Sequence, residues 1–143
     1  MARELSTAEY EELLRFRTGL RRFLRWSESE AAAAGLTPAQ HQLLLAVRGH
    51  VGQTGPTIGD VADSLLLRHH SVVGLVDRAE AAGLVRRRVD PDDARVVRLA
   101  LTPTGSRRLA RLTDAHLDEL AVLATTVRSF SDVLTERGHL RDS

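Results

Sequence analysis

His70, Ser71 and Asp77 lie close together in the sequence and are the side-chain types of a hydrolytic triad. A triad requires the serine hydroxyl within hydrogen-bonding reach of the imidazole. Successive residues of a helix point about 100° apart, so His70 and Ser71 cannot meet as base and nucleophile. The sequence also has no glycine-rich phosphate loop and no His-Glu-x-x-His motif. We therefore expect a protein that is not an enzyme and that needs no cofactor.

Metal and membrane sites are also disfavoured. The 143 residues include no cysteine, and His69 and His70 are adjacent rather than three or four apart, so the usual spacing of zinc ligands is missing. A chain without cysteine suits a reducing compartment, and the cytoplasm is the expected location. No apolar stretch approaches the roughly 18 residues of a membrane span, and the first residues lack the apolar core of a signal peptide.

The arginines carry the strongest chemical signal. All 20 residues counted as lysine or arginine are arginine, and the formal net charge is only +1. Residues 68–111 hold ten arginines against five acids, whereas the remainder holds ten arginines against fourteen acids. The planar guanidinium binds phosphates and guanine edges through paired hydrogen bonds. A near-neutral chain with one basic block predicts a local anionic partner.

Helices are expected before this block. Apolar residues at three- and four-residue spacing predict a long amphipathic helix over 8–34. Thr37 and Gln40, with Pro38 between them, have the form of a capping box and start a second helix. That helix is expected to end at one of the next two glycines.

Two shorter helices follow, separated by a tight turn. Thr57 and Asp60 predict the capped start of a helix over 58–65. A partner helix is expected over 69–82, where Gly83 provides the stop signal.

The hydrophobic period then changes from helical to alternating. Residues 84–89 and 96–101 are short and rich in β-branched side chains, and the turn between them, 90–94, is rich in Asp and Pro. This pattern predicts a β-hairpin. Two further helices are expected after it, over 103–125 and 127–137.

The order of these elements predicts a mainly α fold with a small β-hairpin, a winged helix-turn-helix. In such a fold the second helix of the pair, here 69–82, enters the major groove of DNA. The hairpin over 84–101 forms a wing that can reach an adjacent groove. The basic block covers both elements, so topology and charge agree.

Two motifs resemble the MarR family of bacterial transcriptional regulators. The more specific is DARVVRLALTPTG, from Asp93 to Gly105, which is similar to the family's wing signature: Asp-x-Arg at the tip, an alternating strand, and Leu-Thr-x-x-Gly opening the next helix. The other comprises residues 61–65, 71–78 and 83–85, which resemble the family's helix-turn-helix and its exit into the wing.

The resemblance covers residues 36–105 and implies an organisation for the whole chain. A single MarR-type domain over 1–143 is expected, with the winged helix-turn-helix at 36–102 and dimerisation helices at 1–35 and 103–143. The resemblance implies a homodimer that binds a palindromic operator in double-stranded DNA. It also implies a repressor relieved by a small aromatic or phenolic effector. The alternative is a winged helix used only for protein–protein interaction.

Three positions depart from the family pattern. Leu66 stands where glycine is usual in the turn, and Arg68 stands where serine or a similar cap is usual. Ala94 stands where the first of two wing-tip arginines is common.

Arg95 is the first candidate for DNA contact. The resemblance implies that it enters the minor groove and that Asp93 orients it, and a narrow A·T-rich minor groove attracts arginine. A surface ion pair that closes the hairpin is the alternative. Strand alternation prevents Arg86, Arg87 and Arg88 from all facing one way. We expect Arg86 and Arg88 to contact the DNA backbone, with a solvated face as the alternative.

The start of the helix over 69–82 supplies a second set of candidates. Small or polar side chains at this end can reach base edges or phosphates; they are Arg68, His69, His70, Ser71 and Gly74. A simple capping role for His70 or Ser71 is the alternative. Arg78 has two open roles, a phosphate contact or an ion pair that pins the wing.

Outside the basic block, we expect Arg17, Trp26 and His41 to contribute to an effector pocket, with Arg17 or His41 as the partner of a carboxylate. The apolar stripes of the first and last helices exceed what a lone winged helix needs. A homodimer interface is the best use for them.

Overall fold

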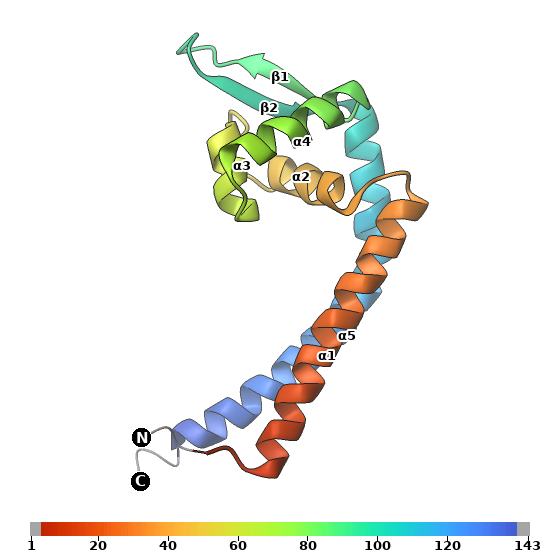
Figure 1. Ribbon diagram of the computed structural model, residues 1–143, viewed down its shortest axis with the longest axis vertical. Helices are drawn as coiled ribbons and strands as arrows, with labels where there is room; N and C mark the ends of the chain where they lie inside the picture. Colours follow the sequence, from red (N-terminus) through yellow and green to blue (C-terminus); the bar gives the residue numbers. More distant parts are fainter. Residues whose placement is uncertain (1–3, 140–143) are drawn as a thin grey trace. The chain divides into compact units, whose positions relative to one another are not determined.

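The computed structural model describes residues 4–139, so the outermost parts of the predicted dimerisation helices, 1–3 and 140–143, lie outside the described residues. As far as the hairpin, the elements follow the expected order (Figure 1). They are α1 (Thr7–Ala33), α2 (Pro38–Arg48), α3 (Ile58–Leu65), α4 (His69–Ala81), β1 (Val85–Val89), β2 (Val97–Leu101) and α5 (Pro103–His139). The predicted fold class, a mainly α winged helix-turn-helix with a small hairpin, is confirmed.

The chain divides into two compact units. The two-helix unit comprises residues 4–29 and 115–139, which contain parts of α1 and α5. The winged-helix unit comprises residues 30–114 and contains α2, α3, α4 and the hairpin.

Two helices of the winged-helix unit begin as the sequence predicts. The Thr37 side chain accepts a hydrogen bond from the backbone N–H of Gln40, whose side chain accepts one from the backbone N–H of Thr37. Thr57 and Asp60 make the same reciprocal pair at the start of α3. Each pair satisfies two backbone donors that a helix start leaves free, which fixes where α2 and α3 begin.

A single apolar core holds the winged-helix unit together. It is formed by one face of each helix and by the inward residues of the hairpin, and its largest fully buried side chains are Leu43, Leu44, Val61, Val72, Val76, Leu84, Val85 and Leu99. Because α4 buries its Val72 and Val76 side, its opposite side faces solvent.

The hairpin is antiparallel, with Val85 opposite Leu101 and Val89 opposite Val97. The loop before α3 runs beside β2, since the backbone N–H of Leu99 donates to the carbonyl of Pro56 at 2.8 Å. This hydrogen bond ties β2 to the loop that leads into α3.

Gly105 makes a close approach possible where α5 leaves the hairpin. A Cβ atom at this position would overlap the carbonyl oxygen of Leu84. The first turn of α5 therefore packs directly on the backbone that enters β1, and only glycine fits there.

The prediction of two helices over 103–125 and 127–137 is wrong, because α5 is continuous from Pro103 to His139. The two threonines near the expected break do not interrupt it. Thr125 donates its hydroxyl to the carbonyl of Ala121, and Thr126 donates to that of Val122. Their hydroxyls thus hydrogen-bond to carbonyls one turn earlier in α5, and the helix continues through both residues.

In the two-helix unit, α1 and α5 lie side by side (Figure 1). Phe16 and Phe130 stack with ring centroids 4.9 Å apart, and Gly19 lies against the side chain of Thr126. No helix within residues 4–139 combines the length and the apolar character needed to cross a bilayer.

Candidate nucleic-acid interface

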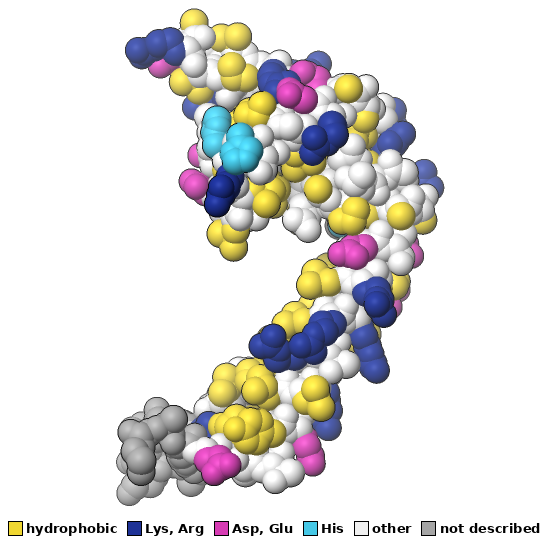
Figure 2. All heavy atoms as spheres, in the orientation of Figure 1, with side chains coloured by type: hydrophobic (Ala, Val, Ile, Leu, Met, Phe, Trp, Pro, Cys, Tyr) yellow, Lys and Arg dark blue, Asp and Glu magenta, His cyan; other side chains and the backbone are white. Residues whose placement is uncertain are grey.

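The N-terminal end of α4 is an exposed, cationic surface. Arg68 is the N-cap residue, but its side chain makes no capping hydrogen bond. Arg68, His69, His70 and Ser71 are all exposed. Figure 2 shows arginine and histidine side chains gathered over this part of the winged-helix unit. The predicted candidates at this helix start are therefore brought together on one accessible surface.

Gly74 lies one turn further along α4, under the side chain of Arg78. A Cβ at Gly74 would lie 3.3 Å from the guanidinium nitrogen Nη1 of Arg78, which is tighter than ordinary packing. The glycine thus leaves room for the arginine to lie along the helix. Arg78 is exposed and makes no ion pair with any residue that the structure describes.

The wing tip presents one arginine held by one carboxylate. Arg95 Nε donates to Asp93 Oδ1, and Arg95 Nη2 donates to Asp93 Oδ2, each at 3.1 Å. The Arg95 side chain is nevertheless 90% exposed. The hydrogen bond from the guanidinium lowers the pKa of the Asp93 carboxyl below its ordinary value. Asp93 therefore orients the guanidinium while leaving most of its surface accessible to a partner.

Asp90 and Arg98, which the sequence reasoning did not single out, build the turn that carries this tip. Asp90 is only 8% exposed. Its Oδ1 accepts from the backbone N–H groups of Asp92 and Asp93 at 2.8 and 3.0 Å, and its Oδ2 accepts from Arg98 Nε. Arg98 also donates through Nη1 to the carbonyl of Gly55 at 3.0 Å.

The hydrogen bond from Arg98, with those from the backbone, holds the pKa of Asp90 below its usual range. The sequence did contain the signal for this turn. An Asp followed by Pro-Asp-Asp is typical of a side chain that bonds the backbone two and three residues later. What was missed is the Arg98 partner across the hairpin.

The middle arginine of the 86–88 run connects the wing to α4. Arg87 Nη2 donates to Asp77 Oδ1 at 2.6 Å, and Arg87 Nη1 donates to Glu80 Oε1 at 2.7 Å. The backbone N–H of Arg87 also donates to Glu80. The ion pair that pins the wing, one of the two open roles of Arg78, is therefore made by Arg87.

Arg86 and Arg88 are exposed, and strand alternation places them on the face of β1 opposite Arg87. The structure thus separates the arginine run into one positioning residue and two accessible cations. Contact between these two and DNA stays a prediction.

The effector candidates lie in different surroundings. Arg17 is exposed on α1, and His41 is a half-buried residue of α2. Trp26 packs against His116, with ring centroids 4.6 Å apart, and Ser27 Oγ lies 2.7 Å from His116 Nε2. His116 was not predicted, because a single histidine on a helix gives no pattern. An effector site built from Arg17, Trp26 and His41 stays a prediction.

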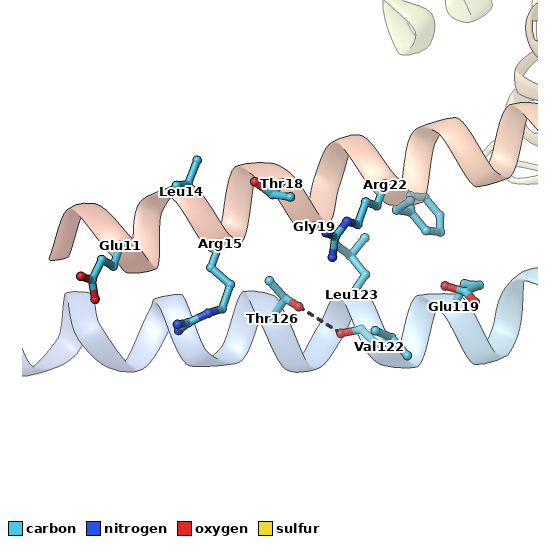
Figure 3. Close-up of a pocket in the computed structure, with 11 residues that line it drawn as sticks. Glu11, Leu14, Arg15, Thr18, Gly19, Arg22, Glu119, Val122, Leu123 and Thr126 are labelled. Carbon is cyan, nitrogen blue, oxygen red and sulfur yellow. Dashed lines mark hydrogen bonds between the residues drawn. The ribbon is translucent and has the colours of Figure 1, made fainter. Parts of the chain in front are cut away.

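A groove of about 550 Å³ runs between α1 and α5 inside the two-helix unit (Figure 3). Figure 3 shows Arg15 and Arg22 reaching from α1 toward α5, while Leu14 points away. The groove floor includes Leu123. None of the three predicted effector residues lines it.

The two-helix unit leaves many of its apolar side chains exposed. His116 is its only buried residue among those whose burial the structure describes. Large apolar side chains of α1 and α5 are exposed along the unit: Tyr10, Leu14, Leu24, Leu117, Leu120, Val122, Val127 and Leu134. A helix pair with so little burial is not expected to be stable alone in water.

Within residues 4–139, no group of three His, Cys, Asp or Glu side chains is placed to hold a metal ion.

Comparisons with known proteins agree with the geometry. The family model described as MarR family matches residues 34–96. The transcriptional repressor CouR, solved bound to a 23-mer DNA duplex, is 26% identical with a TM-score of 0.65, and the match covers 99% of this chain and 100% of that one. The MarR family transcription regulator SP03579 is 26% identical with a TM-score of 0.65, and the match covers 93% of this chain and 84% of that one.

AbsC, a MarR family transcriptional regulator from Streptomyces coelicolor, has a TM-score of 0.70 at 19% identity, covering 99% of this chain and all of that one, and so shows the same fold. A search of curated protein sequences gave no match. The match to the MarR family model thus lies between the two long helices, over a segment that contains α2, α3, α4 and β1.

Proposed function

We propose that this protein is a DNA-binding transcriptional regulator, with α4 in the major groove and the wing over residues 84–101 in the minor groove. The observation that carries the proposal is the pairing of Arg95 with Asp93. The Arg95 side chain is 90% exposed, yet two hydrogen bonds to the Asp93 carboxylate hold its guanidinium in place. Such a side chain is suited to insertion between the phosphates of a narrow groove. The exposed cationic start of α4 supplies the second contact surface.

A homodimer on a palindromic operator is part of the proposal. The exposed apolar side chains of the two-helix unit need a partner, and a second copy of the same helices provides a matching apolar surface. Two copies related by a two-fold axis would present two α4 helices to two half-sites of the DNA.

The regulatory outcome in this proposal is repression relieved by a small aromatic or phenolic effector. Trp26 offers an aromatic face for such a ligand, although His116 packs on that side chain in the described structure. An effector acts if it favours a dimer in which the spacing of the two α4 helices no longer fits the half-sites.

A salt titration tests the proposal. The full chain is titrated against a fluorescent duplex from upstream of its own gene and against a random duplex of equal length, between about 50 and about 200 mM salt. DNA binding predicts that log K falls linearly with log salt, by about 0.9 for each phosphate neutralised. A flat response, or no binding to either duplex, overturns the proposal and favours a winged helix that contacts only other proteins.

A further inference from the structure

The turn between α3 and α4 holds a leucine in a costly conformation. Leu66 has φ +55° and ψ +41°, and it is the only non-glycine residue at positive φ among those described. The left-handed region costs an ordinary L-residue about 1 kcal/mol or more, whereas glycine adopts it freely. Folding alone would therefore favour glycine at this position.

The side chain of Leu66 adds a second cost. It is 91% exposed, and Leu67 beside it is 42% exposed. We call these two side chains the turn patch. Neither the strain nor the exposure contributes to the fold, so the fold provides no reason for a leucine at position 66.

The surroundings of the turn patch indicate what it contacts. Arg68, His69 and His70 follow it directly and are exposed. Figure 2 shows hydrophobic side chains next to arginine and histidine at this end of the winged-helix unit. An apolar spot continuous with a cationic surface fits an anionic partner that itself has apolar spots. DNA is such a partner, because the C5-methyl group of thymine is an apolar group in its major groove.

We propose that Leu66, supported by Leu67, contacts thymine methyl groups at the edge of the major groove and makes the turn a reader of thymine. This inference rests on the proposed function, because it requires α4 to dock in the major groove. It assigns base selectivity to a position outside the α4 residues.

The test compares thymine with deoxyuridine, which differs only by the C5-methyl group. A tight-binding duplex is first selected from a randomised pool with the wild-type homodimer. Each thymine in it is then replaced by deoxyuridine, one at a time and all together. The first variant, Leu66→Gly, removes both the backbone strain and the apolar side chain. The second, Leu66→Asn, tolerates the left-handed conformation but lacks the apolar side chain. Val51→Ser is the matched control, since Val51 is 93% exposed in a loop.

The wild type and Val51→Ser should lose about fourfold in affinity for each contacted methyl that is removed. Leu66→Gly and Leu66→Asn should bind the thymine duplex more weakly and should not respond to deoxyuridine at those positions. Leu66→Gly should also unfold at a temperature no lower than the wild type, so a folding defect would not explain its weaker binding.

Two outcomes overturn the inference and are distinguishable. If the wild type binds no duplex at all, the proposed function fails and the inference fails with it. If the wild type binds duplex but responds to deoxyuridine no differently from Leu66→Gly, DNA binding stands and the turn patch has another partner.

Discussion

Arg87 of the wing and Asp77 of α4 are joined by a 2.6 Å hydrogen bond between Nη2 and Oδ1. With Glu80, Asp77 would otherwise place two carboxylates beside a surface proposed to face phosphates. One guanidinium therefore does two things. It offsets part of the negative charge of these two acids of α4, and it fixes the position of the wing relative to that helix.

We predict that Arg87→Ala weakens DNA binding without changing the slope of log K against log salt, which we call the salt slope. The charge of Arg87 is already balanced by two carboxylates, so its loss changes the position of the wing and not the count of phosphates neutralised. Unfolding free energy should fall by no more than about 1 kcal/mol, because the pairs are partly solvated. Fluorescence titration against salt and thermal unfolding measure the two effects.

Asp77→Ala combined with Arg87→Ala provides the control. The double variant should lose less stability than the sum of the two single changes, since the second removes a partner already lost. Additive losses would show that the two residues act separately.

Arg95→Ala should change the salt slope as well as the affinity for DNA. Removing an exposed cation that contacts a phosphate-lined groove should make the salt slope less steep by about 0.9. It should also weaken binding to all duplexes, most of all to those with A·T-rich flanks. Asp93→Asn is the matched change, because it keeps the cation and removes the anion that orients it. It should retain the salt slope but lose the preference for A·T-rich flanks. Equal salt slopes for Arg95→Ala and the wild type would contradict a groove contact.

Sequence choice should depend on the first turn of α4. Ser71→Ala and His70→Ala should each reduce discrimination between the selected duplex and single-base variants by about 1–3 kcal/mol where a base contact is lost. Competition binding with a set of single-base variants measures this. Neither hydroxyl nor imidazole provides the N-cap, which is Arg68, so both variants should keep the wild-type unfolding temperature. A uniform loss of affinity for every duplex would assign these residues to phosphate contact instead.

The local fold was predictable where a short sequence pattern determines the structure. Capping residues such as Thr57 and Asp60 satisfy backbone donors wherever they occur, so both helix starts were placed correctly. The change from helical to alternating period located the hairpin. The continuity of α5 was not predictable in the same way, because Thr125 and Thr126 are poor helix formers whose hydroxyls happen to bond back to the helix.

The candidate site was predictable only in part for a similar reason. Asp93 and Arg95 are two residues apart, and their pairing follows from local geometry. Arg87 reaches Asp77 ten residues away and Asp90 reaches Arg98 across the hairpin, so both pairs depend on how elements pack. Charge counting identified the basic block but could not tell a cation that positions the wing from one that faces a partner.

Acid should weaken the wing through Asp90. Hydrogen bonds from Arg98 and from the backbone stabilise its ionised form and lower its pKa from the ordinary value of 3.8. A carboxyl whose pKa is lower in the folded state contributes stability above its unfolded pKa and loses that contribution as the pH falls through the folded pKa. Asp90→Asn should therefore be less stable than the wild type at neutral pH, with the gap closing below about pH 4. Chemical denaturation over a pH series measures the gap, and a gap independent of pH would assign the effect to packing.

The last prediction concerns the join between α5 and the hairpin. Gly105→Ala should destabilise the winged-helix unit by about 1–3 kcal/mol, because its Cβ would overlap the backbone carbonyl of Leu84, which cannot move without displacing β1. Gly59→Ala in α3 is the matched control, since the Cβ there meets only Thr57 Oγ1 at an ordinary 3.7 Å. That change should leave stability equal or raise it by up to about 1 kcal/mol, as expected for alanine in a helix. Thermal unfolding of the two variants measures the contrast, and equal unfolding temperatures would contradict the close approach of α5 to the strand.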